Sequence, residues 1–277
     1  MKETLVLRFL YKTALGRYLL KPLVQPGVSR LAGKVLSSGA SKCLVPYFIR
    51  KHGIDMENIA VPQGGFASFN DFFTRRRMVD SFDREDGHLI SPCDGFLTPL
   101  KIKKGIVFEV KHTQYSLTEL LKDKELANRF EDGMALVFRL TPANYHRYSY
   151  PANGKILKSR RIKGQLHCVR PIATSTYPVY IQNSREYQVI ETERFGTMVQ
   201  MEIGALLVGK IQNHKSTLQK RQIQAGEEKG YFEFGGSTII LLFQKHAIRM
   251  NKKLYEKRNC DGEILVQQGE FVAWEEG

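Results

Sequence analysis

The sequence has few cysteines and no long apolar run. Its 277 residues include only four cysteines, Cys43, Cys93, Cys168 and Cys260, and no two of them form a CxxC pair. This spacing argues against a zinc site and a secreted disulfide framework, and it fits a reducing compartment. The longest apolar run, residues 239–243, has the length of a strand and is too short to cross a bilayer. No small-residue cleavage site follows the N-terminal apolar stretch, so we predict no signal peptide.

Acidic residues are in deficit. Asp and Glu number 28 against 42 Lys and Arg, which gives a net charge of +14. A surplus of this size favours a polyanionic partner, either nucleic acid or an anionic membrane surface. The chain has no zinc-finger spacing, no RNP-like aromatic motif and no long basic tail. We therefore expect it to bind an anionic phospholipid membrane and no nucleic acid.

Residues 2 to about 50 have a helical pattern. Leu7, Tyr11, Ala14 and Tyr18 recur at helical spacing and predict one apolar stripe on a helix that ends before Pro26. Basic side chains flank this stripe, as in helices that lie in a lipid headgroup layer. An ordinary helix packed on its own domain fits the same pattern.

From residue 86 onward, short apolar runs alternate with Asp-Gly, Asn-Gly, Pro and Gly, which is typical of a β-rich region with hairpins. One helix is expected within it, at residues 116–123. Before it, Ser68 can cap a short aromatic helix. We predict an α+β protein with a helical, membrane-associating region at residues 1–85 and a β-rich catalytic region at residues 86–277.

Three polar positions could carry chemistry, although each pattern is weak alone. In SPCDGFL, Asp94 stands in an Asp-Gly hairpin signal and is either a solvated turn residue or a carboxylate that polarises a histidine. In TPANYHRYSY, His146 is either structural or a general acid or base, with Arg147 beside it as an anion binder. In GQLHCVRPIA, His167 is either a loop residue or part of a site.

The stretch YFEFGGSTIILLF places two glycines and Ser237 between an aromatic and an aliphatic run. A glycine pair before a buried strand usually marks a bulge or a turn. The same residues also suit backbone cleavage, because the Gly236 carbonyl can be held in a strained geometry within reach of the Ser237 hydroxyl. Acyl transfer, β-elimination and hydrolysis would then leave an N-terminal pyruvoyl group. Such a ketone can form a Schiff base and accept electrons.

Together these motifs resemble those of the phosphatidylserine decarboxylase proenzyme family. The match runs from about residue 60 to 245 through SFNDFFTRR, SPCDG, YSLTELL, YHRY followed by P-x-x-G, VRPIA, PVYIQNSREY and GEEKGYFEFGGSTIILLF, in the family's order. The last block is the most specific, because the family's cleavage site is a Gly-Ser pair in this setting.

The resemblance implies a self-processing lyase that converts phosphatidylserine into phosphatidylethanolamine and CO2. Cleavage between Gly236 and Ser237 would give associated β and α chains, residues 1–236 and 237–277, and Ser237 would become the pyruvoyl cofactor without any metal or dissociable cofactor. Asp94 stands where the family has a cleavage-assisting Asp. A homodimer and a peripheral position on the cytoplasmic face of a bacterial cell membrane are also expected.

The chain departs from the family at one position. Members often carry a second histidine in a Y-H-R-x-H pattern, and this histidine is commonly assigned to processing, but here the residue is Ser149. A serine hydroxyl is no general base near neutral pH. His146 therefore takes both tasks, or His167 supplies the imidazole, or processing uses Asp94 without a histidine. We assign His146 to reprotonation during decarboxylation and keep His167 as a candidate for processing.

Two alternatives remain compatible with the motifs. Because the motifs concern the serine head group, the substrate could be another serine-head-group lipid or a soluble serine derivative. Because of Ser149, the chain could also be an unprocessed, non-catalytic homologue that binds lipid or nucleic acid. Two chains in denaturing mass spectrometry would favour an enzyme.

Overall fold

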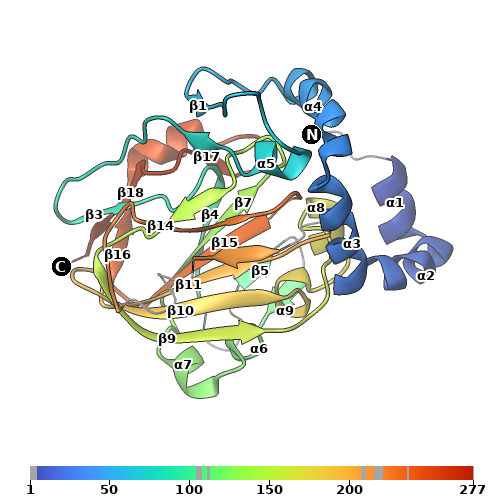
Figure 1. The fold of residues 1–277 in the computed structure, drawn as a ribbon. Coiled ribbons are helices and arrows are strands. Elements are labelled where there is room, and N and C mark those ends of the chain that lie inside the picture. Colours follow the sequence, from blue (N-terminus) through green and yellow to red (C-terminus); the bar gives the residue numbers. More distant parts are fainter. Residues whose placement is uncertain are drawn as a thin grey trace.

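The computed structural model describes residues 5–103, 108–110, 113–206, 210–214, 221–235 and 237–276. Helices dominate the N-terminal part and strands dominate the remainder (Figure 1), which confirms the predicted α+β class. The division into two domains at residue 85 stays a prediction.

The helical elements are α1 (Leu5–Lys12), α2 (Ala14–Leu23), α3 (Pro26–Leu36), η1 (Gly39–Cys43), α4 (Leu44–His52), α5 (Phe69–Phe73), α6 (Leu117–Leu121), α7 (Lys124–Asn128), α8 (Pro171–Thr174), α9 (Val179–Gln182) and η2 (Lys252–Lys257). The strands are β1 (Ile59–Ala60), β2 (Arg76–Arg77), β3 (His88–Ile90), β4 (Gly95–Lys101), β5 (Phe108–Val110), β6 (Thr113–Tyr115), β7 (Met134–Leu140), β8 (Arg147–Ser149), β9 (Gly154–Ile162), β10 (Arg185–Thr192), β11 (Thr197–Ile203), β12 (Ile211–Asn213), β13 (Gln222–Ile223), β14 (Glu228–Phe232), β15 (Ser237–Phe243), β16 (Ile248–Met250), β17 (Ile264–Val266) and β18 (Phe271–Glu275).

The first predicted helix is interrupted at Thr13, well before the expected break. The Thr13 hydroxyl accepts a hydrogen bond from the Gly16 N–H at 2.9 Å and so caps α2. A Cβ on Gly16 would lie 2.0 Å from the Phe9 carbonyl oxygen, so this tight corner requires glycine. The single apolar stripe is therefore wrong, because Tyr11 is buried in the main core whereas Tyr18 is 70% exposed.

Two short helices predicted from the sequence are present. The Ser68 hydroxyl accepts from the Asp71 N–H at 3.1 Å and caps α5 as expected, and α6 lies within residues 116–123. The phenylalanines of α5 form an aromatic cluster with Phe48, apart from the main core. Phe234 packs against this cluster. The N-terminal region therefore contacts the segment that leads into the Gly-Ser pair.

An eight-stranded antiparallel sheet forms the main body, in the order β13-β9-β10-β11-β15-β7-β4-β17. Strand β15 lies inside this sheet between β11 and β7, and all seven of its residues are buried. The three-stranded sheet β12-β14-β8 packs over one face of β10 and β11. Buried contacts join the two layers, such as the ion pair of Lys229 on β14 with Glu202 on β11 at 2.7 Å.

Two of the segments that connect the large sheet with the sheet β16-β18-β3 are those from β3 to β4 and from β17 to β18. The two crossing segments run side by side, because the Ser91 N–H donates to the Glu270 carbonyl at 2.8 Å and the Gly269 N–H donates to the Ser91 carbonyl at 2.9 Å. The hairpin predicted at Asp94-Gly95 is therefore wrong, since β3 and β4 belong to different sheets.

Candidate active site

Asp94 and Ser237 lie at the same end of the eight-stranded sheet. The register aligns Phe96 of β4 with Arg139 of β7, and Arg139 with Thr238 of β15. Ser237 is one residue before this row on β15, and Asp94 immediately precedes β4. Strand β7 lies between these two strands. Because neighbouring strands are about 4.8 Å apart, the two backbones are about 10 Å apart.

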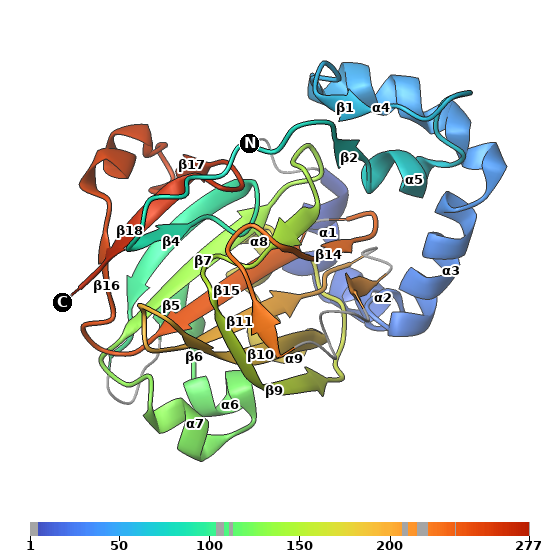
Figure 2. The same cartoon turned by 60° about the vertical axis from the view of Figure 1, so that its left-hand side comes forward.

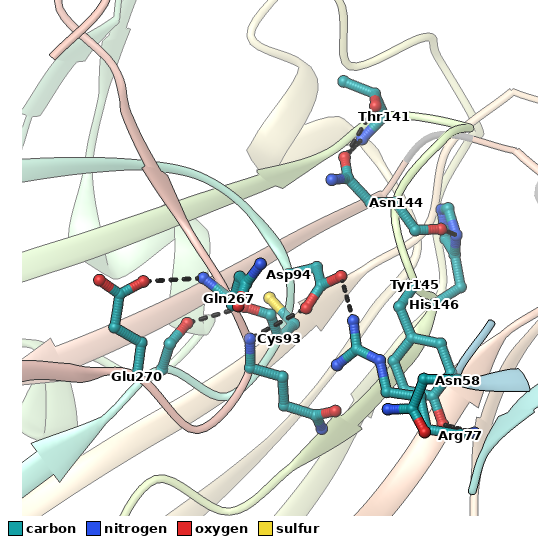
Figure 3. A network of polar contacts seen from close by, with 12 residues as sticks. Asn58, Arg77, Cys93, Asp94, Thr141, Asn144, Tyr145, His146, Gln267 and Glu270 are labelled. Atoms are coloured by element: carbon teal, nitrogen blue, oxygen red, sulfur yellow. Dashed lines mark hydrogen bonds and ion pairs between the residues drawn. The ribbon is translucent and has the colours of Figure 1, made fainter. Parts of the chain in front are cut away.

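Asp94 is held by two partners from distant parts of the chain (Figure 3). One carboxylate oxygen accepts from Arg77 Nη2 at 2.6 Å, and the other accepts from the Gln268 N–H at 2.9 Å. The Arg77 guanidinium also lies over the Tyr145 ring, 4.3 Å from its centre. The Asp94 side chain is only 14% exposed, so it is a fixed carboxylate and not a solvated turn residue.

His146 is buried just before β8. Its Nδ1 donates to the Asn144 carbonyl at 2.9 Å, and since a carbonyl only accepts, the lone pair is on Nε2 (Figure 3). Nε2 is buried and makes no hydrogen bond among the described residues. The Gly235 carbonyl favours the protonated ring and so raises its pKa, against the larger effect of burial. Phe73 packs against the imidazole with ring centres 4.1 Å apart. Burial, reinforced by the charge of Arg75, lowers the pKa of His146 to about 3, so the ring is neutral at physiological pH.

Ser237 is the first residue of β15, and its hydroxyl is buried without a hydrogen-bond partner. Two residues earlier, Gly235 has a φ of 140°, a conformation that side chains with a Cβ rarely adopt. Gly236, the other half of the predicted scissile bond, lies outside the described residues. The serine thus has a buried hydroxyl that makes no hydrogen bond among the described residues, two positions after a backbone conformation that favours glycine.

The Ser237 side chain points into the interior between the two sheets. Side chains alternate along a strand, so Ser237 and Ile239 share a face of the large sheet. Ile239 pairs with Glu202, whose carboxylate binds Lys229 of the covering sheet. The neighbouring hydroxyl of Thr238 lies on the opposite face. His146 enters the same interior from the covering sheet, because its carbonyl accepts from the Phe232 N–H of β14 at 2.9 Å.

Ser149, which replaces the family's second histidine, is connected to Asp94 through Gln268. The Gln268 side chain donates to the Ser149 hydroxyl at 3.2 Å and to the Pro92 carbonyl at 3.3 Å, while its backbone N–H holds Asp94. A hydroxyl and an amide therefore occupy the position where an imidazole was expected. Neither group can accept a proton at neutral pH.

His167 lies in a different environment. Its Nε2 pairs with Gln165 Oε1 at 2.9 Å, and its ring stacks on Tyr177 with centres 4.8 Å apart. Tyr11 of α1 packs against the same imidazole. Burial lowers the pKa of His167 to about 4. Within the described residues, no contact joins this ring to the other three predicted side chains, and its role in processing stays a prediction.

Four residues that shape the site escaped the motif analysis. Arg77 and Gln268 fix Asp94, Asn144 fixes the tautomer of His146, and the guanidinium of Arg75 lies close enough to lower the pKa of that ring. The three consecutive arginines after the aromatic helix were a visible signal in the sequence. Nothing in the local sequence marks Asn144 or Gln268, because their partners come together only in the fold.

Comparison with known proteins places this geometry in a family. A family model described as phosphatidylserine decarboxylase matches residues 69–272. The chain belongs to the phosphatidylserine decarboxylase family. The match includes Asp94, His146, His167 and Ser237.

Bacterial relatives of the phosphatidylserine decarboxylase family match almost the whole chain. Phosphatidylserine decarboxylase proenzyme 2 of Clostridium acetobutylicum is 41% identical over 273 residues, which are 96% of this chain and 90% of the relative. The proenzyme of Fusobacterium nucleatum is 36% identical over 95% of this chain and 89% of its own length. That of Ruminiclostridium cellulolyticum is 35% identical over 96% and 90%. The relatives are named as proenzymes, which are precursors that require processing.

The described part of this family member contains no group of three or more His, Cys, Asp or Glu side chains that could hold a metal ion. Its four cysteines are free thiols.

Proposed function

We propose that this chain cleaves its own backbone before Ser237 and uses the resulting pyruvoyl group at the surface of an anionic membrane. The reaction follows from family membership: phosphatidylserine is converted into phosphatidylethanolamine with release of CO2, a step of phospholipid biosynthesis. The observation that carries the cleavage proposal is the Ser237 hydroxyl, buried without a partner at the start of a central strand.

Self-cleavage begins when Ser237 Oγ attacks the carbonyl carbon of Gly236. The peptide C–N bond breaks and a C–O ester bond forms, while His146 Nε2 takes the hydroxyl proton and passes it to the departing nitrogen of Ser237. We assign Asp94 to orienting the reacting groups. Arg77 holds its carboxylate in place, and each carboxylate oxygen can still accept a second hydrogen bond. β-Elimination then removes the Cα proton of Ser237 and breaks its Cβ–Oγ bond, which frees Gly236 as a carboxylate and leaves a Cα–Cβ double bond. The resulting enamine tautomerises to an imine, and water replaces its nitrogen, which leaves as ammonia.

In the mature protein, the pyruvoyl group supplies a carbonyl that condenses with the substrate amine and accepts the electrons released with CO2. The amine must lose a proton before it condenses, and the substrate α-carbon must gain one after CO2 leaves. His146 can serve the second step, because its imidazolium releases a proton readily at a pKa of about 3; at the same pKa the neutral ring is a weak base for the substrate amine. The surrounding burial keeps water from competing for this proton.

The experiment that tests self-processing is intact-mass measurement under denaturing conditions. Wild type should give chains of residues 1–236 and 237–277, the smaller one blocked by pyruvoyl, whereas Ser237→Ala should stay one chain and release no CO2 from phosphatidylserine. Thr238→Val is the matched control, because it removes a neighbouring buried hydroxyl on the opposite face and should cleave normally. Retained activity of Ser237→Ala would contradict the assignment.

The membrane proposal is supported by the surface of the N-terminal helices. Between residues 5 and 54 the chain has nine Lys and Arg and no Asp or Glu. Helices α1, α2 and α3 also leave large apolar side chains in solvent: Leu5, Val6, Phe9, Leu15, Tyr18, Leu19, Leu23, Leu31 and Val35 are all more than a third exposed. A surface that combines both properties suits the headgroup layer of an anionic bilayer. No helix among the described residues has the length and apolarity needed to cross a membrane.

We place this membrane contact on the cytoplasmic face of a bacterial cell, since four free thiols fit a reducing compartment. Phosphatidylserine, as a component of that surface, would reach the site without leaving the membrane. A homodimer, expected from the family resemblance, stays a prediction.

A further inference from the structure

Arg75 is a buried cation whose guanidinium makes no hydrogen bond or ion pair with another described residue, although it lies over the Phe72 ring, 5.1 Å from the ring centre. It follows α5 in the chain and is 5% exposed, and its Nε and Nη1 are both buried without a hydrogen bond. Burial and the nearby Arg77 lower the pKa of Arg75 to about 10, so the guanidinium keeps its charge at neutral pH. A buried charge that lacks a partner is strongly unfavourable. Such a group in a native fold points to a ligand that enters later.

The two neighbouring arginines of the site have the partners that Arg75 lacks. Arg77 binds Asp94 at 2.6 Å, and Arg147 binds Glu228 at 2.8 Å. Arg147 also donates to two backbone carbonyls, including that of Arg75 itself. Among the described residues, no carboxylate forms an ion pair with the Arg75 guanidinium.

Arg75 also stands beside the reacting groups. Phe73, two residues before Arg75, packs on the His146 ring with centres 4.1 Å apart, and Arg147, the residue after His146, donates to the Arg75 carbonyl at 3.2 Å. The charge of Arg75 also lowers the pKa of His146. Helix α5, directly before Arg75, is tied to the segment before the scissile bond, because Asn70 Oδ1 accepts from the Phe234 N–H at 3.2 Å. An anion that binds Arg75 would therefore lie next to His146, near the start of β15.

We propose that Arg75 binds the phosphodiester of the lipid head group. The substrate carries two anions close to its amine, the carboxylate and the phosphodiester. The carboxylate leaves as neutral CO2, so a guanidinium bound to it would stabilise the ground state more than the transition state and slow the reaction. The phosphodiester keeps its charge throughout, so a cation there strengthens binding without opposing the chemistry. This inference rests on the proposed pyruvoyl site at Ser237, which fixes where the amine reacts.

Steady-state kinetics with soluble dihexanoyl phosphatidylserine test the proposal. Arg75→Met should cleave itself normally, keep kcat within about threefold and raise KM about tenfold to a hundredfold, because a charge-assisted contact made equally in ground and transition states is lost. Arg75→Lys should fall between Met and wild type. Arg76→Gln is the matched control, since Arg76 is the adjacent, exposed arginine and should leave both constants unchanged.

A carboxylate-free inhibitor separates the two anions of the substrate. Glycerophosphoethanolamine contains the phosphodiester and lacks the carboxylate. Its inhibition constant should rise in Arg75→Met by the same factor as KM. An unchanged inhibition constant would show that Arg75 contacts the carboxylate, and a lower kcat at constant KM would assign it to the chemical step. Either result overturns the proposal, as does an Arg75→Met chain that no longer cleaves.

Thermal melting without substrate gives an independent measurement. Because the buried Arg75 guanidinium has no carboxylate or hydrogen-bond partner among the described residues, Arg75→Met should raise the midpoint of unfolding in the Ser237→Ala background and in wild type. A lower midpoint would show a structural role and overturn the proposal. If instead Ser237→Ala still cleaved, the pyruvoyl assignment would fail, while the melting and inhibition results would continue to report on Arg75.

Discussion

Ser237, His146 and Arg75 lie at one end of the large sheet, and each has a buried polar atom that makes no hydrogen bond within the described residues. Each is a nucleophile, a base or a cation, and each is costly to bury in this state. Thr238 and His167 are among the other residues with such an atom. Elsewhere in the interior a buried charge is neutralised, as in the Lys229–Glu202 pair. The combination of a nucleophile, a base and a cation supports the proposal that the backbone reacts and the substrate binds here.

The protonation of His146 links this site to stability. Its pKa is about 6.5 in the unfolded chain and about 3 in the folded protein, so the unfolded state binds more protons below pH 6.5. The free energy of unfolding should fall as the pH drops from about 6.5 toward 3, with a slope of up to about 1.4 kcal/mol per pH unit from this group. Urea denaturation of single-chain Ser237→Ala between about pH 7 and pH 4 measures that slope.

His146→Asn in the same background should reduce the slope by one proton. What remains comes in part from His167, whose pKa is also lowered by burial. His246→Asn is the control, because that ring is 73% exposed and asparagine tolerates its positive φ of 60°. An unchanged slope in His146→Asn would contradict the burial of a neutral imidazole.

At the scale of elements, the helix pair α1 and α2 has a side buried in the core and a side exposed to solvent. One side of the pair belongs to the core, through Tyr11 and Leu20, and the other side leaves Leu15 and Leu19 exposed. Removing residues 1–24 would therefore disturb the core as well as the membrane surface. Point substitutions on the exposed side separate the two effects.

We predict that Leu15→Glu combined with Leu19→Glu lowers binding to anionic phospholipid vesicles by at least about tenfold, since two buried leucines contribute about 3 kcal/mol or more. Co-sedimentation measures the bound fraction. Leu157→Glu, an exposed leucine of β9, is the matched control and should bind like wild type. If the double variant bound vesicles as well as wild type does, α2 would not be part of the membrane-binding surface.

At the scale of the whole molecule, the proposed cut leaves the sheets intact. The α chain would keep β15 between β7 and β11 of the β chain, β17 on β4 and β18 on β3 (Figure 2). Strand β15 is buried along its full length, so neither chain can leave without exposing the core.

We therefore predict that the two cleaved chains elute together in native size-exclusion chromatography and separate only in denaturant. The elution volume should equal that of uncleaved Ser237→Ala, because no backbone contact other than the cut bond is lost. A small chain that elutes alone would contradict this arrangement.

Much of the chemistry was readable from local sequence. The aliphatic run after Ser237 predicted a buried strand, Ser68 predicted a helix cap, and the motif around His146 predicted an imidazole among aromatic rings. These features depend on neighbours within a few residues, so the sequence alone determines them. The family followed from the order of such blocks.

The tertiary structure decided what depends on residues far apart in the chain. The Asp94-Gly95 pair is typical of a hairpin turn, but β3 before it pairs with β18 and β4 after it pairs with β7. The segment from β17 to β18 runs beside this connection and brings the Gln268 N–H to Asp94. The helical spacing of apolar residues near the N-terminus predicted one continuous helix, but the chain turns tightly at Gly16 and forms two helices. Whether a charge is paired is likewise a property of the fold. Arg75 and Arg77, two residues apart, look equivalent in sequence, but packing gives Arg77 a carboxylate and leaves Arg75 Nε and Nη1 without a hydrogen bond among the described residues.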